Sequence, residues 1–141
     1  MTLTQDQPGD PTITDNVTID QLQKAIDSID GQHISFIVLE NTKGDYLQCA
    51  GTDSHLTVEF RQNFEDRFKH YVLGPKNENK SPLDVTWSII ECKVGPIHVH
   101  DSEVLNKDDV KTIFGAYLST GVVSAHLNLR NVTKKFVENG S

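Results

Sequence analysis

The sequence has few of the residues that staple or interrupt a fold. Its 141 residues include two cysteines, five prolines and one tryptophan. The cysteines, Cys49 and Cys92, lack the paired spacing of a zinc site or a disulfide framework, so we expect two buried, reduced thiols. A chain of this length buries on the order of 70% of its extended surface, so a hydrophobic core can form without such staples.

Signatures of common catalytic sites are also missing. The sequence contains no G-x-G-x-x-G nucleotide loop, no G-K-[ST] phosphate loop and no H-E-x-x-H zinc motif. A nucleophile and base such as Cys49 and His55 can be paired on paper, but no oxyanion element or positioned third group flanks them. The sequence therefore predicts a protein that is not an enzyme and holds no cofactor.

Basic charge is in short supply. Thirteen lysines and arginines stand against 20 acidic residues, and the net charge is -7 with the histidines neutral. This balance argues against direct nucleic-acid binding through phosphate neutralisation and favours a basic protein partner. The segment 1–16, MTLTQDQPGDPTITDN, has neither a basic flank nor an apolar run. We therefore expect no signal peptide and no membrane anchor, and a cytoplasmic protein.

Two segments have the periodicity of amphipathic helices. The longer spans 106–121, with Asn106 as its N-terminal cap and Gly121 at its left-handed end. Its apolar side consists of Val110, Ile113, Phe114, Tyr117 and Leu118. The shorter helix begins after Thr18, which forms a capping box with Gln21, and its apolar stripe ends before Gly31.

The remaining apolar sequence consists of short runs that predict strands. They are expected at 34–39, 46–50, 56–61, 68–73, 85–92, 97–100 and 122–129. The run at 85–92 is apolar on both sides and is expected near the centre of the sheet, while 74–82 reads as a loop. Residues 1–16 read as a flexible tail before a single domain at 17–141. The order predicts an α+β domain, an antiparallel meander of about five to six strands with two main helices on one face.

Such a sheet leaves its second face open, and we expect a partner to bind there. His55, Thr57, Glu59 and Arg61 alternate with apolar residues and should line the open face. Lys69 and Tyr71 would extend that face if the next strand pairs alongside. A solvated sheet face that binds nothing is the alternative interpretation.

A histidine pair offers a different chemistry. His98 and His100 lie two residues apart on a predicted strand, so their side chains point to one side about 6.6 Å apart, within reach of one metal ion. Residues that would supply a third ligand are Asp101, Glu103 and His70. The alternative is two solvent-facing histidines on a strand whose Ile97 and Val99 face inward.

Two functions other than protein binding therefore stay open. The histidine pair would serve a metal-binding protein or a small enzyme, which metal content would test. A pocket between helices and sheet, with Trp87 and Tyr117 in its wall, would serve a small-ligand protein. Thermal stabilisation by a panel of metabolites would test that second possibility.

Three stretches share a layout with a known family. They are YLQCAGTDSHLTVEFR (46–61), FKHYVLG (68–74) and EVLNKDDVKTIFGAYLSTG (103–121). This layout resembles small immunity proteins of bacterial polymorphic toxin systems, in which a Glu-aromatic-basic step on a strand precedes a helix closing on phenylalanine and glycine. Glu59-Phe60-Arg61 and the segment 114–121 match that pattern. The resemblance implies a cytosolic antitoxin that binds a cognate toxin, with a basic nuclease as a candidate, and blocks its action.

Overall fold

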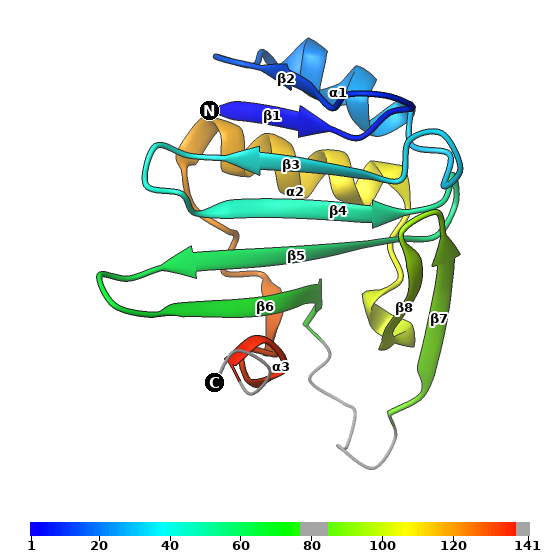
Figure 1. Cartoon of the computed structure of the whole chain (residues 1–141). Helices are drawn as coiled ribbons and strands as arrows, with labels where there is room; N and C mark the ends of the chain where they lie inside the picture. Colours follow the sequence, from blue (N-terminus) through cyan, green and yellow to red (C-terminus); the bar gives the residue numbers. More distant parts are fainter. Residues whose placement is uncertain (77–84, 138–141) are drawn as a thin grey trace.

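The fold is α+β, with a large antiparallel sheet, as the sequence predicts (Figure 1). The computed structural model describes residues 1–76 and 85–137, so most of the predicted loop at 74–82 lies outside the described residues. The strands of the main sheet are β1 (Thr2–Gln5), β2 (Thr12–Thr14), β3 (Phe36–Glu40), β4 (Tyr46–Gly51), β5 (Leu56–Asn63), β6 (Phe68–Pro75) and β9 (Leu127–Asn131). The other elements are α1 (Ile19–Asp27), the hairpin strands β7 (Trp87–Cys92) and β8 (Gly95–His100), the short 3-10 helix η2 (Asp101–Glu103), α2 (Lys107–Thr120) and α3 (Lys134–Val137).

The described strands of the main sheet number seven, more than the five to six expected, in the order β2-β1-β3-β4-β5-β6-β9. The central part, β3 to β6, is the predicted meander of neighbours in sequence. The strands that were not expected are β1 and β2, which pair with each other and, through β1, with β3. Their long-range pairing has no local sequence signal, whereas β9, which pairs with β6, overlaps the strand expected at 122–129.

The N-terminal segment is not the flexible tail that its composition predicts. Residues 1–16 contain β1 and β2, which pair with each other and with β3. Leu3 faces Leu39 across the ladder, and its side chain is buried in the main core. Asp6 anchors the end of β1 by accepting backbone hydrogen bonds from Ser35 and Phe36. This polar segment is held by its strand pairing, by the packing of Leu3 and Met1 on the core, and by the buried Asp6 carboxylate.

The run at 85–92 was expected at the centre of the sheet, and this expectation is wrong. Its strand, β7, pairs only with β8 among the described strands, forming a separate hairpin. One side of the hairpin is buried, where Ile90 and Val99 join a small apolar cluster with Val72 and Val132. The two-sided apolar pattern therefore has one side packed on β6 and another that is exposed.

Both predicted main helices are present, with the predicted ends. Thr18 forms the capping box with Gln21 at the start of α1, and Asn106 forms one with Asp109 at the start of α2. Gly121 ends α2 with a φ of 77°, a left-handed conformation that costs glycine little. None of the described helices is both long and apolar enough to cross a membrane.

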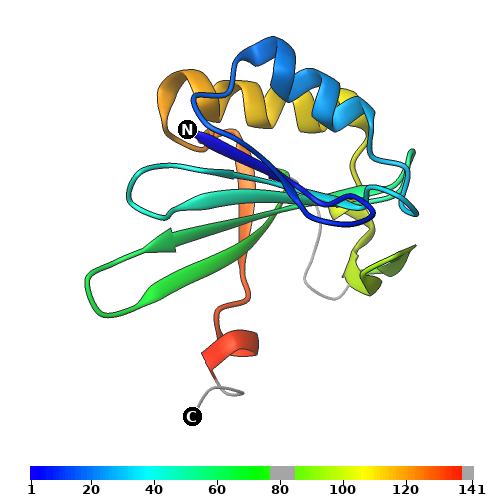
Figure 2. The ribbon, with the colours of Figure 1, turned by 45° about the horizontal axis from the view of Figure 1, so that its top comes forward.

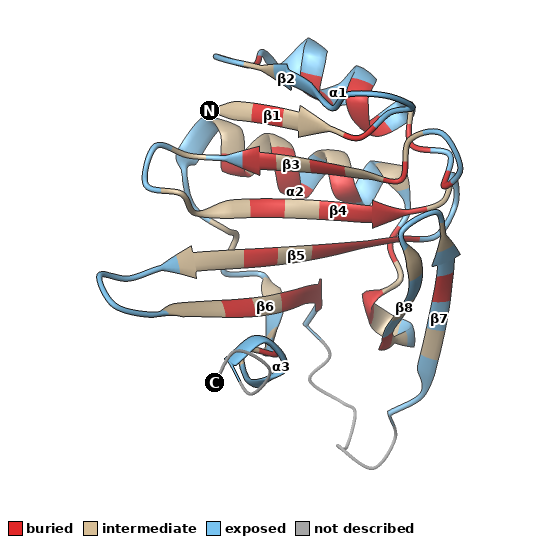
Figure 3. Ribbon diagram, viewed as in Figure 1, coloured by how far each residue is buried: buried red, intermediate tan, exposed pale blue. Residues whose placement is uncertain are grey.

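The main core lies between the sheet and these helices. Figure 2 shows α1 and α2 on the same side of the sheet, and α3 and the hairpin on the other side. The burial pattern in Figure 3 places buried residues along β3, β4 and β5. The largest fully buried side chains include Phe114 and Tyr117 of α2, which join Leu22 and Ile26 of α1 in one cluster with the strands.

Candidate functional site

The predicted binding residues of β5 share one face of the sheet, but that face is largely covered. Thr57, Glu59 and Arg61 alternate with Leu56, Val58 and Phe60, which belong to the main core on the other face. Thr57 is fully buried, and its hydroxyl has no hydrogen-bond partner among the described residues. His55 precedes the strand and is exposed, with Nδ1 2.8 Å from the Ser54 hydroxyl.

Lys69 and Tyr71 do not extend this face. The register of β5 and β6 pairs Gln62 with Lys69 and Phe60 with Tyr71, so both predicted residues lie on the core side. Tyr71 stacks on Phe60 with ring centroids 6.1 Å apart. A change of one residue in strand register reverses every side chain, and the length of the connecting turn, which sets the register, is not readable from strand patterns.

His70, and not Lys69 or Tyr71, shares the sheet face of Glu59 and Arg61. It lies between Arg61 and Glu59 and is 2% exposed. The Arg61 Nε donates to Nδ1 of His70 over 3.0 Å, and Nε2 lies 2.7 Å from Oε1 of Glu59. A guanidinium can only donate, so Nδ1 accepts and Nε2 carries the proton that is donated to Glu59. This Arg61–His70–Glu59 chain holds a carboxylate in a fixed place on the sheet.

Aromatic rings surround the cationic end of the chain. The Arg61 guanidinium lies 4.0 Å from the ring centroid of Phe68 and 4.7 Å from that of Phe136 in α3. The Phe136 ring is also 4.4 Å from the His70 ring, and Tyr46 is 6.2 Å away on another side. Burial raises the pKa of the Tyr46 hydroxyl, so Tyr46 stays neutral beside the cation. These contacts stabilise Arg61 in one orientation.

A cavity of about 220 Å³ opens beside the carboxylate end of the chain, between the sheet, β8 and α3. The sheet contributes Glu59 and Val72, and β8 contributes Ile97 and Val99. Phe136 of α3 also lines it. The walls are therefore mainly apolar, and the Glu59 carboxylate is held among them by His70.

The histidine pair lies on the outer side of the hairpin. His98 faces Ile89 and His100 faces Trp87 across the ladder, while Val99 between them is buried. The expected third ligands are engaged elsewhere: Asp101 accepts from Ser88, Glu103 binds Arg130, and His70 belongs to the buried chain. The described residues contain no group of three or more histidine, cysteine, aspartate or glutamate side chains arranged for a metal ion.

A buried ion pair between Glu103 and Arg130 anchors the end of the hairpin. Glu103 is 1% exposed and accepts from both Nε and Nη2 of Arg130, each over 2.8 Å. The backbone N–H of His100 donates to the same carboxylate over 2.8 Å. Gly74 of β6 makes room, because a Cβ there would lie 3.2 Å from Cγ of Glu103. The pair joins β9, η2 and the end of β8.

The outer side of the hairpin carries exposed apolar residues. Trp87 is 55% exposed and Ile89 56%, and they lie beside the two histidines with Glu91 at the end of the strand. We call Trp87, Ile89, Glu91, His98 and His100 the hairpin patch. The Trp87 ring is held in place, since the His100 ring meets it edge-on at 4.5 Å.

Tyr117 and Trp87, which were expected to line one ligand pocket, lie in different surroundings. Tyr117 is buried in the main core, where its ring meets that of Phe60 at 6.0 Å, whereas Trp87 is exposed on the hairpin. Among the described residues they line no common pocket, because Tyr117 packs in the core between helices and sheet. A cavity of about 210 Å³ does lie between α2 and the strands β6 and β9, but its lining contains neither Tyr117 nor Trp87.

The two thiols differ in burial. Cys49 is buried as expected, and burial raises the pKa of its thiol well above the usual range, although Lys107 opposes the shift. A thiol of this kind is a poor nucleophile. Cys92 is only half-buried, because it lies near the hairpin turn, where its Sγ is 3.7 Å from the Gly95 carbonyl oxygen.

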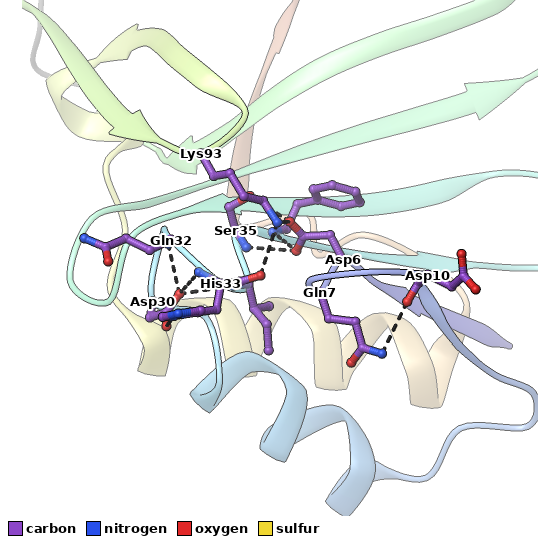
Figure 4. A network of polar contacts seen from close by, with 10 residues as sticks. Asp6, Gln7, Asp10, Asp30, Gln32, His33, Ser35 and Lys93 are labelled. Atoms are coloured by element: carbon purple, nitrogen blue, oxygen red, sulfur yellow. Dashed lines mark hydrogen bonds and ion pairs between the residues drawn. The ribbon is translucent and has the colours of Figure 1, made fainter.

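The hairpin turn is tied to the sheet through Asp6, as Figure 4 shows. Lys93, in the turn, forms an ion pair of 2.9 Å with the Asp6 carboxylate and donates to the carbonyl of His33 over 3.1 Å. Asp6 also accepts from both the N–H and the hydroxyl of Ser35. Burial raises the pKa of Asp6, but the hydrogen bonds from Phe36, Lys93 and Ser35 outweigh it, so its pKa is lowered overall.

We expect Asp6 to make the protein sensitive to acid. Its folded pKa lies below the unfolded value of 3.8, so its contribution is fully present above that pH and is lost as pH falls through the folded pKa. In urea titrations from pH 7 downward, the free energy of unfolding should fall more steeply below pH 3.8 in the native protein than in Asp6→Asn. Asp66→Asn, in the exposed β5–β6 turn, controls for loss of one charge. Equal slopes for the native protein and Asp6→Asn would contradict the expectation.

Neither family models nor curated proteins give a match to the sequence. The geometry presents two features, the hairpin patch on the outside and the cavity beside Glu59.

Proposed function

We propose that this protein is a non-catalytic binding module, an immunity protein that neutralises a cognate bacterial toxin by direct binding in the cytoplasm. The hairpin patch is the observation that carries the proposal. The layout of 46–61, 68–74 and 103–121, which resembles that of small immunity proteins, supplies the class of partner. In this proposal α1 and α2 cover one face of the sheet, and the hairpin is presented on the other.

The patch has the composition of a binding hot spot. Trp87 and Ile89 are each more than half exposed and lie side by side on one strand face. Tryptophan is among the residues that contribute most to interfaces, and a ring already held by His100 loses little freedom on binding. Polar neighbours such as His98 and Glu91 provide a rim. The net charge of -7 favours a basic partner, such as a nuclease, by speeding encounter.

The proposed surface differs from the face expected from the sequence. Thr57 is buried, Arg61 is held by His70, and Glu59 is mostly buried beside a cavity, so the β5 face offers little flat contact area. The hairpin covers part of this face and carries the exposed groups instead. We therefore assign binding to the hairpin, which lies on the sheet face where a partner was expected from the sequence.

The proposal is tested with the product of a neighbouring toxin gene. We expect co-expression of this protein to abolish the toxicity and purified protein to bind the toxin. The double substitution Trp87→Ala with Ile89→Ser should weaken binding by about 100-fold or more, measured by titration calorimetry. Ile13→Ser is the matched control, because Ile13 is an apolar side chain 65% exposed on β2, away from the patch.

Two results would overturn parts of this proposal. Full protection by the double variant would show that the patch is not the binding site. A neighbouring product that is not toxic, or whose toxicity this protein does not relieve, would contradict the immunity function itself. Thermal unfolding of each variant shows whether lost binding reflects lost folding.

A further inference from the structure

The cavity beside Glu59 combines apolar walls with one fixed charge. Its volume of about 220 Å³ exceeds the roughly 150 Å³ of an apolar cavity that holds benzene. Val72, Ile97, Val99 and Phe136 line it, so a ring or short alkyl stem would bury its surface there. His98 belongs to both the hairpin patch and this cavity, and the other patch residues do not line the cavity.

Glu59 is positioned to receive a ligand. Among the described residues it accepts one hydrogen bond, at Oε1 from His70, which leaves Oε2 available. The Glu59 side chain is 23% exposed, whereas His70 behind it is 2% exposed, so the open side of the carboxylate is the side away from His70. The Arg61–His70 hydrogen bond fixes the ring, and the ring fixes the carboxylate. Such preorganisation lowers the cost of binding a donor.

We propose that the cavity binds a small organic cation, an ammonium or guanidinium group on a short apolar stem. The cationic group donates to Glu59, and the stem packs against the apolar wall. The cation belongs either to a free amine or to a lysine or arginine side chain of the protein partner. The chemistry recognised is the same in both cases.

The other polar groups around the cavity decide the sign of the ligand charge. Lys135 and His98 also line it, and both residues are exposed. Glu59 is held by a buried partner in the sheet, whereas Lys135 lies on the short, exposed helix α3. The carboxylate, whose position is fixed, therefore selects a cation.

The probe is benzylammonium, with benzyl alcohol and benzoate as neutral and anionic counterparts of the same shape. Binding is followed by methyl and amide NMR on the full chain. We expect saturable shifts at Val72, Val99 and Val132 with benzylammonium, at a Kd of about 1 mM. Benzyl alcohol should bind more weakly and benzoate most weakly. Tighter binding of benzoate, or no saturable shift with benzylammonium, overturns the proposal.

Substitutions place the cation at Glu59. Glu59→Gln keeps an acceptor for His70 but removes the charge, so affinity for benzylammonium should fall about tenfold. Glu40→Gln, an exposed carboxylate on β3, should leave the affinity unchanged. Unchanged affinity in Glu59→Gln, or an equal loss of affinity in Glu40→Gln, contradicts the assignment.

Toxin binding by Glu59→Gln distinguishes the two sources of the cation, and only this measurement rests on the proposed function. If the cation is a partner side chain, Glu59→Gln weakens both probe binding and toxin binding. If it is a free amine, the same variant loses the probe and retains the toxin. The probe titration needs no partner, so failure of the immunity proposal leaves the cavity test intact.

Discussion

Replacing Gly51 by alanine should lower the free energy of unfolding by more than about 3 kcal/mol. Gly51 ends β4 with a φ of 147°, a conformation essentially restricted to glycine. A Cβ at this position would overlap the carbonyl oxygen of His55 and lie 2.9 Å from Cα of Leu56. Both are backbone atoms at the entry to β5, so neither can swing away. Urea unfolding followed by circular dichroism measures the loss.

Gly121→Ala separates the steric overlap from the backbone conformation. Gly121 also has a positive φ, of 77°, but a Cβ there would meet nothing within 4 Å. Its substitution should cost only about 1 to 2 kcal/mol, the usual penalty for a left-handed alanine. Equal losses at Gly51 and Gly121 would show that the β4–β5 turn relaxes around the added methyl group.

Removing the carboxylate of Glu103 should have the second large effect. Glu103→Ala leaves the guanidinium of Arg130 and the N–H of His100 without their acceptor, and we expect a loss of about 2 to 4 kcal/mol. Arg130 is partly solvated, with a side-chain exposure of 20%, so the loss should fall short of that for a fully buried cation. The free energy of unfolding in urea measures it.

The double variant Glu103→Leu with Arg130→Met tests whether the loss arises from an unpaired charge. Replacing both partners by apolar groups of similar size removes the ion pair without leaving a buried charge, so stability should recover by more than half of the loss. A double variant as unstable as Glu103→Ala would instead mean that the packing of Glu103 against Gly74 matters more than its charge.

The sequence predicts elements well where the signal is local. The ends of α1 and α2 are encoded by adjacent residues, since Thr18 with Gln21 and Asn106 with Asp109 each form a capping box. Strands β3 to β6 were found because each is a short apolar run, alternating with polar residues in β5, and turn residues separate the runs. In contrast, β1 depends on Asp6, which binds the N–H of Ser35 across 29 positions. No window of local sequence contains that contact.

The candidate site shows the same division. Alternation along β5 correctly placed Glu59 and Arg61 on one face, because side-chain direction within a strand is a local property. His70 was expected only as a candidate metal ligand, because its position opposite Arg61 depends on the register set by the β5–β6 turn. The cavity required β8 and α3 to meet over that face, and neither contact has a sequence pattern. Exposed Trp87 carried a usable signal, since it alternates with Ser88 at a strand end.

The position of β1 has a consequence for the solution behaviour of the protein. Along β3, the main-chain groups that do not pair with β4 are occupied by β1. A chain trimmed to begin at residue 17 would present these groups to solvent on a strand that contains Ile37, Val38 and Leu39. Unpaired, apolar strands of this kind are templates for intermolecular pairing. By covering this edge of β3, the first sixteen residues remove a site at which chains would otherwise pair and aggregate.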